Sequence, residues 1–218
     1  MRLPGLFKQL SFRAVIRSPS LILPGATKKQ GAGSGAAAPG LVFLASGTVS
    51  SAATLDIVLT AYTAYRGLKF VLSGFLPATD DVELWMRLST DGGSTYDAGA
   101  SNYDWGWAGG NTSPLTQFRG STGDTKILIA GDAAALEGVG NASAEGVNAE
   151  ITLLNQASAA FWPRITHQGA WVDAAATPLN WFIQGGGMRR AAQDTDAVRF
   201  LFETGNISAG NYAVYGLA

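Results

Sequence analysis

The sequence predicts an all-β fold, an antiparallel β-sandwich that follows an extended N-terminal arm. Charged residues make up only 14% of the 218 residues and glycine contributes 28, a composition that favours tight turns over charged helical faces. From Leu41 onward, short apolar or alternating runs are separated by clusters of Gly, Asn, Asp and Pro, which is typical of sandwiches and barrels. The length suits one such domain together with an arm.

Residues 1–40 differ from the rest of the chain in charge. They contain six basic and no acidic residues, whereas residues 41–218 contain nine basic and sixteen acidic ones. Within them, residues 31–40, GAGSGAAAPG, have no side chain large enough to pack and are interpreted as a linker. The sequence therefore predicts a basic arm over residues 1–30, a linker over 31–40 and a β-sandwich domain over 41–218.

An arm of this composition cannot bury a core of its own, so we expect a partner surface or the acidic body to hold it. Docking to protein is favoured over binding of nucleic acid, because the arm has few aromatic residues and the acidic body repels a polyanion. The start of the chain has neither the apolar core of a signal peptide nor a run long enough to span a membrane. The residues expected to dock the arm are Arg2, Phe7, Lys8, Arg13, Arg17, Lys28 and Lys29.

The strands follow from runs of alternating or continuous apolar residues. In residues 82–89, VELWMRLS, every second side chain from Val82 to Leu88 is apolar, so one face of this strand is expected in the core. Asp91-Gly92-Gly93 follows directly and predicts a tight hairpin. Residues 131–146 are weakly patterned and are expected to form a surface excursion without core residues. The predicted strands cover residues 41–45, 54–60, 67–75, 82–89, 101–107, 126–130, 147–154, 161–167, 179–184, 196–203 and 211–217.

The chain has no cysteine and one histidine, which excludes disulfides, thiolate ligands and a histidine metal cluster. His167 ends a predicted strand and is interpreted as a structural residue. Residues 185–190, GGGMRR, lack the Lys and the Ser or Thr of a phosphate-binding loop, so we interpret them as a bend or bulge between strands. Neither a metal ion nor another cofactor is expected.

Paired carboxylates are the remaining route to catalysis, since glycoside hydrolysis requires only that two acids meet in space. Most candidates adjoin Gly, Ser, Thr or Asn, where Asp is expected as a turn-forming residue. We therefore expect a protein without enzymatic activity, and a glycan depolymerase is the alternative. The candidate acids are Asp97, Asp104, Asp124, Asp132, Glu137 and Asp173.

A group of aromatic residues gives the strongest indication of a binding site. Tyr103, Trp105 and Trp107 alternate with small or polar residues and therefore point the same way on a strand. If they are exposed, they can stack on sugar rings, with Asn102 and Asp104 as hydrogen-bonding partners of the hydroxyl groups. If they are buried, they form an aromatic core. The sequence leaves both a carbohydrate site and a core open.

Two segments carry a resemblance to a known class of proteins. Residues 198–217 contain an R-F-x-F strand, a G-N-I turn and a Y-G-L end. Residues 84–103 contain a strand, the run S-x-D-G-G-S-T-Y and the start of an N-Y-x-W return that ends at Trp105. They resemble hairpins of small structural proteins of tailed bacteriophage particles, of the tail-fibre, head-fibre or spike type. The resemblance implies a C-terminal jelly-roll domain, often oligomeric, with no defined active-site motif, and it does not extend to the arm.

These features together predict a structural protein of the virion, assembled in the cytoplasm of the bacterial host. Its arm is expected to dock to capsid, portal, collar or tail proteins, and its jelly roll to project as a fibre, spike or tail component for host attachment. Expected partners are other copies of the chain, as a trimer or hexamer, and a glycan of the host surface. A decoration or cement protein that stabilises the capsid is a further alternative.

Overall fold

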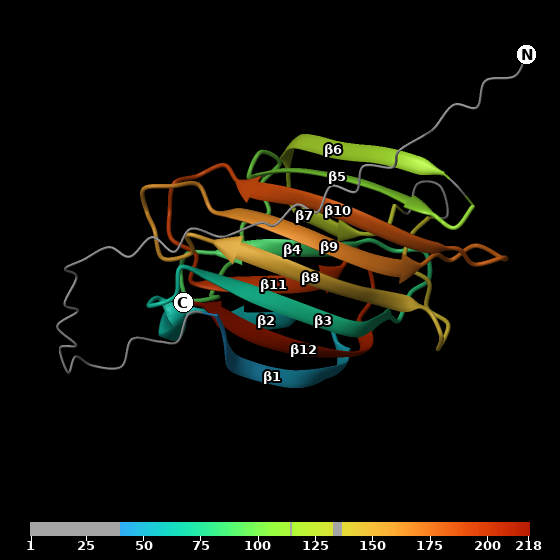
Figure 1. The fold of residues 1–218 in the computed structure, drawn as a ribbon, viewed down its shortest axis with the longest axis horizontal. Helices are drawn as coiled ribbons and strands as arrows, with labels where there is room; N and C mark the ends of the chain where they lie inside the picture. The colour runs from blue at the N-terminus through green and yellow to red at the C-terminus, as the bar shows by residue number, and fades with distance from the viewer. Residues whose placement is uncertain (1–39, 114, 133–136) are drawn as a thin grey trace, which may run out of the picture. The chain divides into compact units, whose positions relative to one another are not determined.

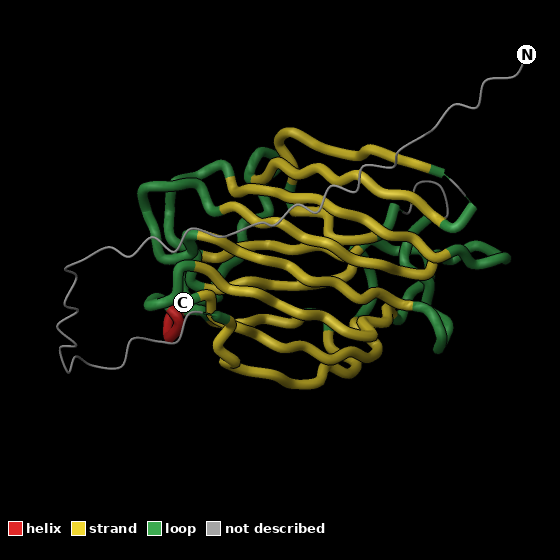
Figure 2. Tube along the Cα trace, in the orientation of Figure 1, coloured by secondary structure: helices red, strands yellow, loops and turns green. Residues whose placement is uncertain are grey.

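The computed structural model describes residues 40–113, 115–132 and 137–218 of the chain. The predicted basic arm over residues 1–30, with every residue expected to dock it, lies outside this described part, as does the linker up to residue 39. The described residues form twelve strands and one short 3-10 helix, and Figure 2 shows how far strands dominate the domain. The elements are β1 (Leu41–Ala52), β2 (Leu55–Val58), η1 (Thr60–Tyr62), β3 (Gly67–Pro77), β4 (Leu84–Ser89), β5 (Tyr103–Asn111), β6 (Thr116–Asp124), β7 (Ile127–Ala130), β8 (Gly146–Leu154), β9 (Arg164–Val172), β10 (Asn180–Arg189), β11 (Ala197–Phe202) and β12 (Ile207–Leu217).

The strands form two antiparallel sheets wound as a jelly roll. The large sheet has the order β1-β12-β3-β8-β9-β10-β5-β6, and the small sheet has the order β2-β11-β4-β7. Four antiparallel pairs are nested along the chain: β1 with β12, β2 with β11, β3 with β8 and β4 with β7. These eight strands are the two Greek keys of a jelly roll. The expected all-β jelly-roll sandwich is therefore confirmed.

Two inserted hairpins widen the large sheet beyond the eight jelly-roll strands. The β5–β6 hairpin lies between β4 and β7 in the chain, and the β9–β10 hairpin lies between β8 and β11. Because β9 pairs with β8 and β10 pairs with β5, both hairpins join the same side of the large sheet. Figure 1 looks onto this sheet, with β1 along one edge and β6 along the other.

Neither of the two segments that were expected to form hairpins, at Asp91 and at Gly205, forms one. The turn at Asp91 forms, with positive φ at Gly92 and Gly93, but β4 belongs to the small sheet and β5 to the large one. Likewise, β11 lies in the small sheet and β12 in the large sheet, so the turn around Gly205 carries the chain across the sandwich. In a jelly roll, consecutive strands commonly change sheets, and local turn chemistry does not reveal this.

Two further expectations about strands need correction. Residues 185–187 were interpreted as a bend or bulge, but they lie inside β10 and keep regular register with β5 and β9. Strand β6 was not predicted at all, because TQFRGSTGD is polar and none of its residues is buried. An edge strand that is exposed on both faces carries no hydrophobic period.

The core lies between the two sheets and is lined by the inward-facing residues of every strand except β6. The expected alternation in β4 is confirmed: Leu84, Met86 and Leu88 are fully buried. The expectation that residues 131–146 contribute nothing to the core is wrong for the described part of that stretch. Val139 is fully buried and pairs with both Val82 and Asp173.

Candidate functional site on the outer face of the large sheet

The aromatic residues predicted to stack on sugars face the core instead. Tyr103 is 0% exposed and Trp107 is 4% exposed, so neither ring can reach a ligand, and the core interpretation holds for both. Burial raises the pKa of Tyr103, and its hydroxyl donates to the Asp97 carbonyl at 3.1 Å. Trp105 is partly buried against the same core and donates its Nε1 proton to Asp124 at 2.8 Å.

The two polar residues of the prediction reach the surface. Asp104 points to the outer face, accepts a hydrogen bond from the Gly123 amide at 2.8 Å and lies 3.7 Å from the guanidinium of Arg190. Asn102 precedes β5 and lines a polar cleft at the end of the sheet. The prediction therefore fails for the rings of Tyr103 and Trp107. Trp105, Asp104 and Asn102 each line a hollow of the accessible surface.

A row of residues with small side chains crosses the outer face of the large sheet. Gly120 of β6 is opposite Gly106 of β5, and Gly106 is opposite Gly186 of β10. The row continues through Thr166 of β9 and Thr152 of β8. Residues in one cross-strand row point to the same face, so the missing side chains leave a depression that runs across five strands.

This depression, which we call the outer trough, contains three adjacent hollows. The first has a volume of about 440 Å³ and shares Thr166 with a second of about 140 Å³. The second shares Glu150 and Gln168 with a third of about 460 Å³. The residues whose side chains surround the trough are Asp104, Ser121, Thr122, Leu154, Arg164 and Met188 at one end, Thr152, Gln168 and Gln184 in the middle, and Val71, Ser73, Asn148, Glu150 and Phe182 at the other end.

The walls of the outer trough combine polar and apolar side chains. Lys69 contacts Glu150 at 2.7 Å, and this contact lowers the pKa of the Glu150 carboxyl group. Gln168 donates to the same carboxylate at 3.1 Å. Phe182 and Leu154 remain 50% and 41% exposed. A surface of this kind offers hydrogen bonds to hydroxyl groups and apolar contact to the face of a sugar ring.

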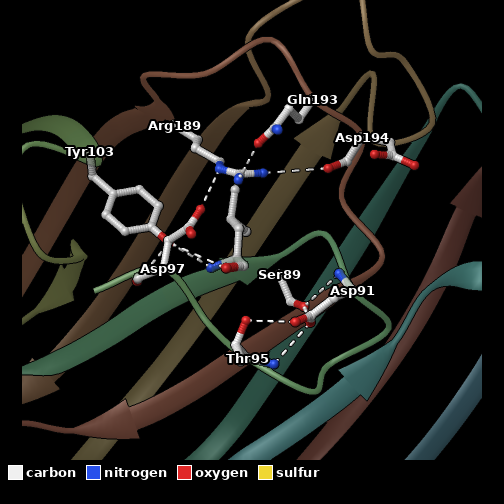
Figure 3. Close-up of polar contacts among 9 residues, drawn as sticks. Ser89, Asp91, Thr95, Asp97, Tyr103, Arg189, Gln193 and Asp194 are labelled. Carbon is white, nitrogen blue, oxygen red and sulfur yellow. Dashed lines mark hydrogen bonds and ion pairs between the residues drawn. The ribbon is translucent and has the colours of Figure 1, made fainter. Parts of the chain in front are cut away.

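A second hollow, which we call the Arg189 cleft, lies where β10 ends. It has a volume of about 240 Å³ and is lined by Asp97, Ser101, Asn102, Arg189, Arg190, Ala191 and Gln193. The Arg189 side chain is only 5% exposed, and its Nε lies 2.5 Å from the Asp97 carboxylate. Its Nη2 donates to the Gln193 side chain at 2.7 Å, and Nη1 lies 3.5 Å from the Asp194 carbonyl. Figure 3 shows the guanidinium enclosed by these partners.

The Asp91 turn beside the cleft is held by its own side chain. The Asp91 carboxylate accepts hydrogen bonds from the Thr95 hydroxyl, the Thr95 amide and the Ser89 hydroxyl, as Figure 3 shows. These bonds lower the pKa of Asp91 to about 2. Its acceptors are thus used within the turn, and no group of three or more potential metal ligands occurs among the described residues.

The six candidate acids are divided between the two ends of the sandwich. Near the end of β10, Asp97 contacts Arg189. At the same end, Asp104 lies near Arg190, and Asp124 accepts a hydrogen bond from the Trp105 indole. Near the start of β10, Asp173 is buried and accepts hydrogen bonds from the Leu179 amide and the Trp181 indole, both at 2.9 Å. Glu137 accepts a side-chain hydrogen bond from Gln117, and Asp132 contacts Arg119 at 2.6 Å.

Sequence reasoning missed the trough and the arginines of the cleft. The sequence does contain three consecutive glycines shortly before two arginines. These residues indicate a trough and a cleft only when the strands that lie beside β10 are known. No protein-family model matches this chain, and no curated protein or solved structure matches it either. Within the described ranges, no helix is both long and apolar enough to cross a membrane. The fold defines the class, a jelly-roll protein with an open, mixed polar and apolar groove.

Proposed function

We propose that this chain is a non-enzymatic binding and assembly protein, and in particular a structural protein of a bacteriophage particle. Its basic arm docks to capsid, collar or tail proteins, and its jelly roll projects as a fibre, spike or tail component that binds a glycan of the host surface. The observation that carries the proposal is the nested jelly-roll winding, which is widespread in viral capsid and lectin domains, with a trough across its widened sheet.

The form of the outer trough supports an extended glycan as the ligand. Its floor crosses β6, β5, β10, β9 and β8, and four strand spacings give a length of roughly 19 Å. Each of its hollows is open to the solvent, so a chain can lie across the strands without being threaded. Threonine and glutamine side chains can reach hydroxyl groups, while Phe182, Leu154 and Met188 supply apolar contact.

Filling the trough tests glycan binding. A Cβ atom at Gly106 would meet only the Arg119 carbonyl oxygen at 3.4 Å and the Gly120 Cα at 4.0 Å, so we expect Gly106→Val to fold and to occupy the floor. The matched control is Ala209→Val, which introduces the same valine side chain at an exposed position of β12. Calorimetric titration with purified host polysaccharide should show binding by wild type and Ala209→Val and at least a tenfold loss in Gly106→Val. Equal binding by all three proteins contradicts the proposed site.

The same titration mixtures test the absence of catalysis. A reducing-end assay on the polysaccharide should show no release of ends over the uncatalysed background. Turnover that disappears in Asp104→Asn or Asp97→Asn would instead establish a depolymerase, because both acids lie at the end of the sheet that borders the trough.

Truncation tests the role of the arm. A protein that begins at Gly40 retains every described strand, and we expect it to fold but to be absent from purified particles. Full-length protein is the control. Normal incorporation of the truncated protein excludes the arm as the anchor. Counting copies in purified particles then separates a fibre or tail component, present in few copies, from a decoration protein present in hundreds.

The edges of the large sheet support an oligomer. Among the described residues, the edge strands β1 and β6 each pair along one side only, and each carries a large exposed ring, Phe43 at 59% and Phe118 at 79%. Unprotected edges of this kind favour pairing with another chain. Native mass spectrometry should give a trimer or hexamer, and Phe118→Lys should weaken it if β6 forms the contact. A monomer at micromolar concentration contradicts the oligomer.

A further inference from the structure

The Arg189 cleft contains hydrogen-bond donors that have few partners among the described residues. Arg190 is exposed, and the partner of its guanidinium within the described residues is Asp104, at 3.7 Å. The side chains of Ser101 and Asn102 line the same cleft, and neither makes a side-chain hydrogen bond to another described residue. Within the described part of the chain, the side-chain donors of Ser101 and Asn102 are therefore unpaired in this recess, and Arg190 has one long contact.

Two of the donors lie beside the same residue, Gly123. A Cβ atom at Gly123 would lie 3.4 Å from Nη1 of Arg190 and 3.7 Å from the hydroxyl of Ser101. The Arg190 amide donates to the Asn102 carbonyl at 2.8 Å, which holds Asn102 beside them. Planar guanidinium groups bind carboxylates with two parallel hydrogen bonds.

Charge accounting favours an anion over a neutral group. The Asp97 carboxylate of the cleft is already paired with Arg189 at 2.5 Å, so Arg189 and Asp97 balance one another. Arg190 is the remaining charge of the cleft, and its 3.7 Å contact with a partly exposed Asp104 is too long for a strong hydrogen bond. An incoming carboxylate can therefore take the better geometry without displacing a buried ion pair.

The position of the cleft links it to the outer trough. Asp104 lines the trough and Arg190 lines the cleft, and their contact joins the two hollows. The cleft, at about 240 Å³, is smaller than the usual ligand pocket of roughly 300 to 1,000 Å³. It suits one acidic unit, whereas the trough suits the chain to which that unit belongs. Arg164 at the same end of the trough adds positive charge.

We propose that the Arg189 cleft binds the carboxylate of an acidic sugar unit in the glycan that occupies the outer trough. Arg190 donates to the carboxylate, Ser101 and Asn102 donate to the same group or its neighbouring hydroxyls, and Arg189 holds the wall of the cleft through Asp97. This inference rests on the proposed glycan binding and makes it selective: glycans with carboxylates bind, and their esters do not.

The test uses full-length protein and four probes: tri-galacturonic acid, sialyllactose and the methyl ester of each. Arg190→Met keeps most of the side-chain length and removes the charge, and Arg66→Met is the control, since Arg66 is an exposed arginine outside the cleft. Wild type and Arg66→Met should bind one or both acids. Loss of a charge-assisted pair weakens binding about tenfold to hundredfold. We expect this loss when Arg190→Met is compared with wild type, and also when the ester is compared with the acid that wild type binds.

Three results would overturn the inference: equal binding of the acid and its ester, unchanged affinity in Arg190→Met, or no binding of either acid by wild type. The failure of glycan binding itself is distinguishable from these. Suppose that host polysaccharide binds to wild type but not to Gly106→Val, and that neither acid binds. The assignment of the cleft is then wrong, but the trough is still supported as a glycan site. If polysaccharide and both acids fail, neither site binds glycans.

Discussion

Replacing His167 with leucine tests the electrostatics of the buried core. His167 lies on β9 and points inward, 3% exposed, and neither ring nitrogen has a hydrogen-bond partner in the described residues. Gly185 of β10 is its cross-strand neighbour, and a Cβ atom there would lie 2.7 Å from Nε2. A charged imidazole in this site would be desolvated without compensation. Burial therefore lowers the pKa of His167 from 6.5 to about 4.

The sign of the pH effect follows from this lowered pKa. As the pH falls below 6.5, the unfolded chain binds a proton at His167 that the folded chain excludes until about pH 4. The free energy of unfolding therefore decreases over this window and is unaffected by His167 above it. With these two pKa values, the loss between pH 7 and pH 4.5 is about 2.5 kcal/mol.

Urea unfolding at pH 7 and pH 4.5 measures this loss. Carboxylates such as Glu150 also respond to acid, but they are present in wild type and variant and cancel in the comparison. We expect the acid-induced loss in His167→Leu to be smaller than in wild type by about 2.5 kcal/mol. Thr166→Leu, an exposed position on the same strand, should keep the wild-type dependence.

The same pH dependence in His167→Leu and wild type would refute the reasoning. It would mean that the imidazole is protonated or hydrated in the folded protein and that its pKa is not lowered by burial. A variant that is less stable at both pH values by the same amount reports only a packing defect. The difference between the two pH values is therefore the decisive quantity.

Two further predictions concern stability at pH 7, both measured by urea unfolding. Asp97→Ala leaves the Arg189 guanidinium buried without its ion-pair partner and should cost about 3 kcal/mol; a loss below about 0.5 kcal/mol would show that Gln193 and solvent compensate fully. Gly185→Ala places a methyl group 2.6 Å from the Cβ of Trp107 and should cost about 1 to 3 kcal/mol. Gly106→Ala, whose nearest contact would be at 3.4 Å, should change stability little, and equal costs for the two alanines would contradict the assignment of their faces.

The strands were largely predictable because the signal for them is local. Alternating apolar residues identified β4 and its buried face, as the burial of Leu84 and Leu88 confirms. The same signal failed for β6, since an exposed edge strand has no hydrophobic period. It also failed for the partners of each strand, because turns at Gly92 and Gly205 are compatible both with a hairpin and with a crossing to the other sheet.

The candidate site was less predictable because it is made by rows across strands. Gly120, Gly106 and Gly186 are far apart in the chain and become one trough floor only when β6, β5 and β10 pair in their observed register. Consecutive glycines suggested a bend when considered alone. Arg190 was noted only as part of a segment that does not bind phosphate, and nothing local indicates its neighbours Ser101 and Asn102.

The sequence by itself determined that Tyr103 and Trp107 share one face of their strand, because side chains alternate with a period of two. Only the tertiary structure decided that this face is the core. Strand β5 joins the large sheet beside β10, and the small sheet then covers the side that carries both rings. The opposite side, with Asp104 and Gly106, was left to the solvent and the trough. The physical reason is that faces are fixed relative to each other by local geometry, whereas burial is fixed by pairings between distant segments.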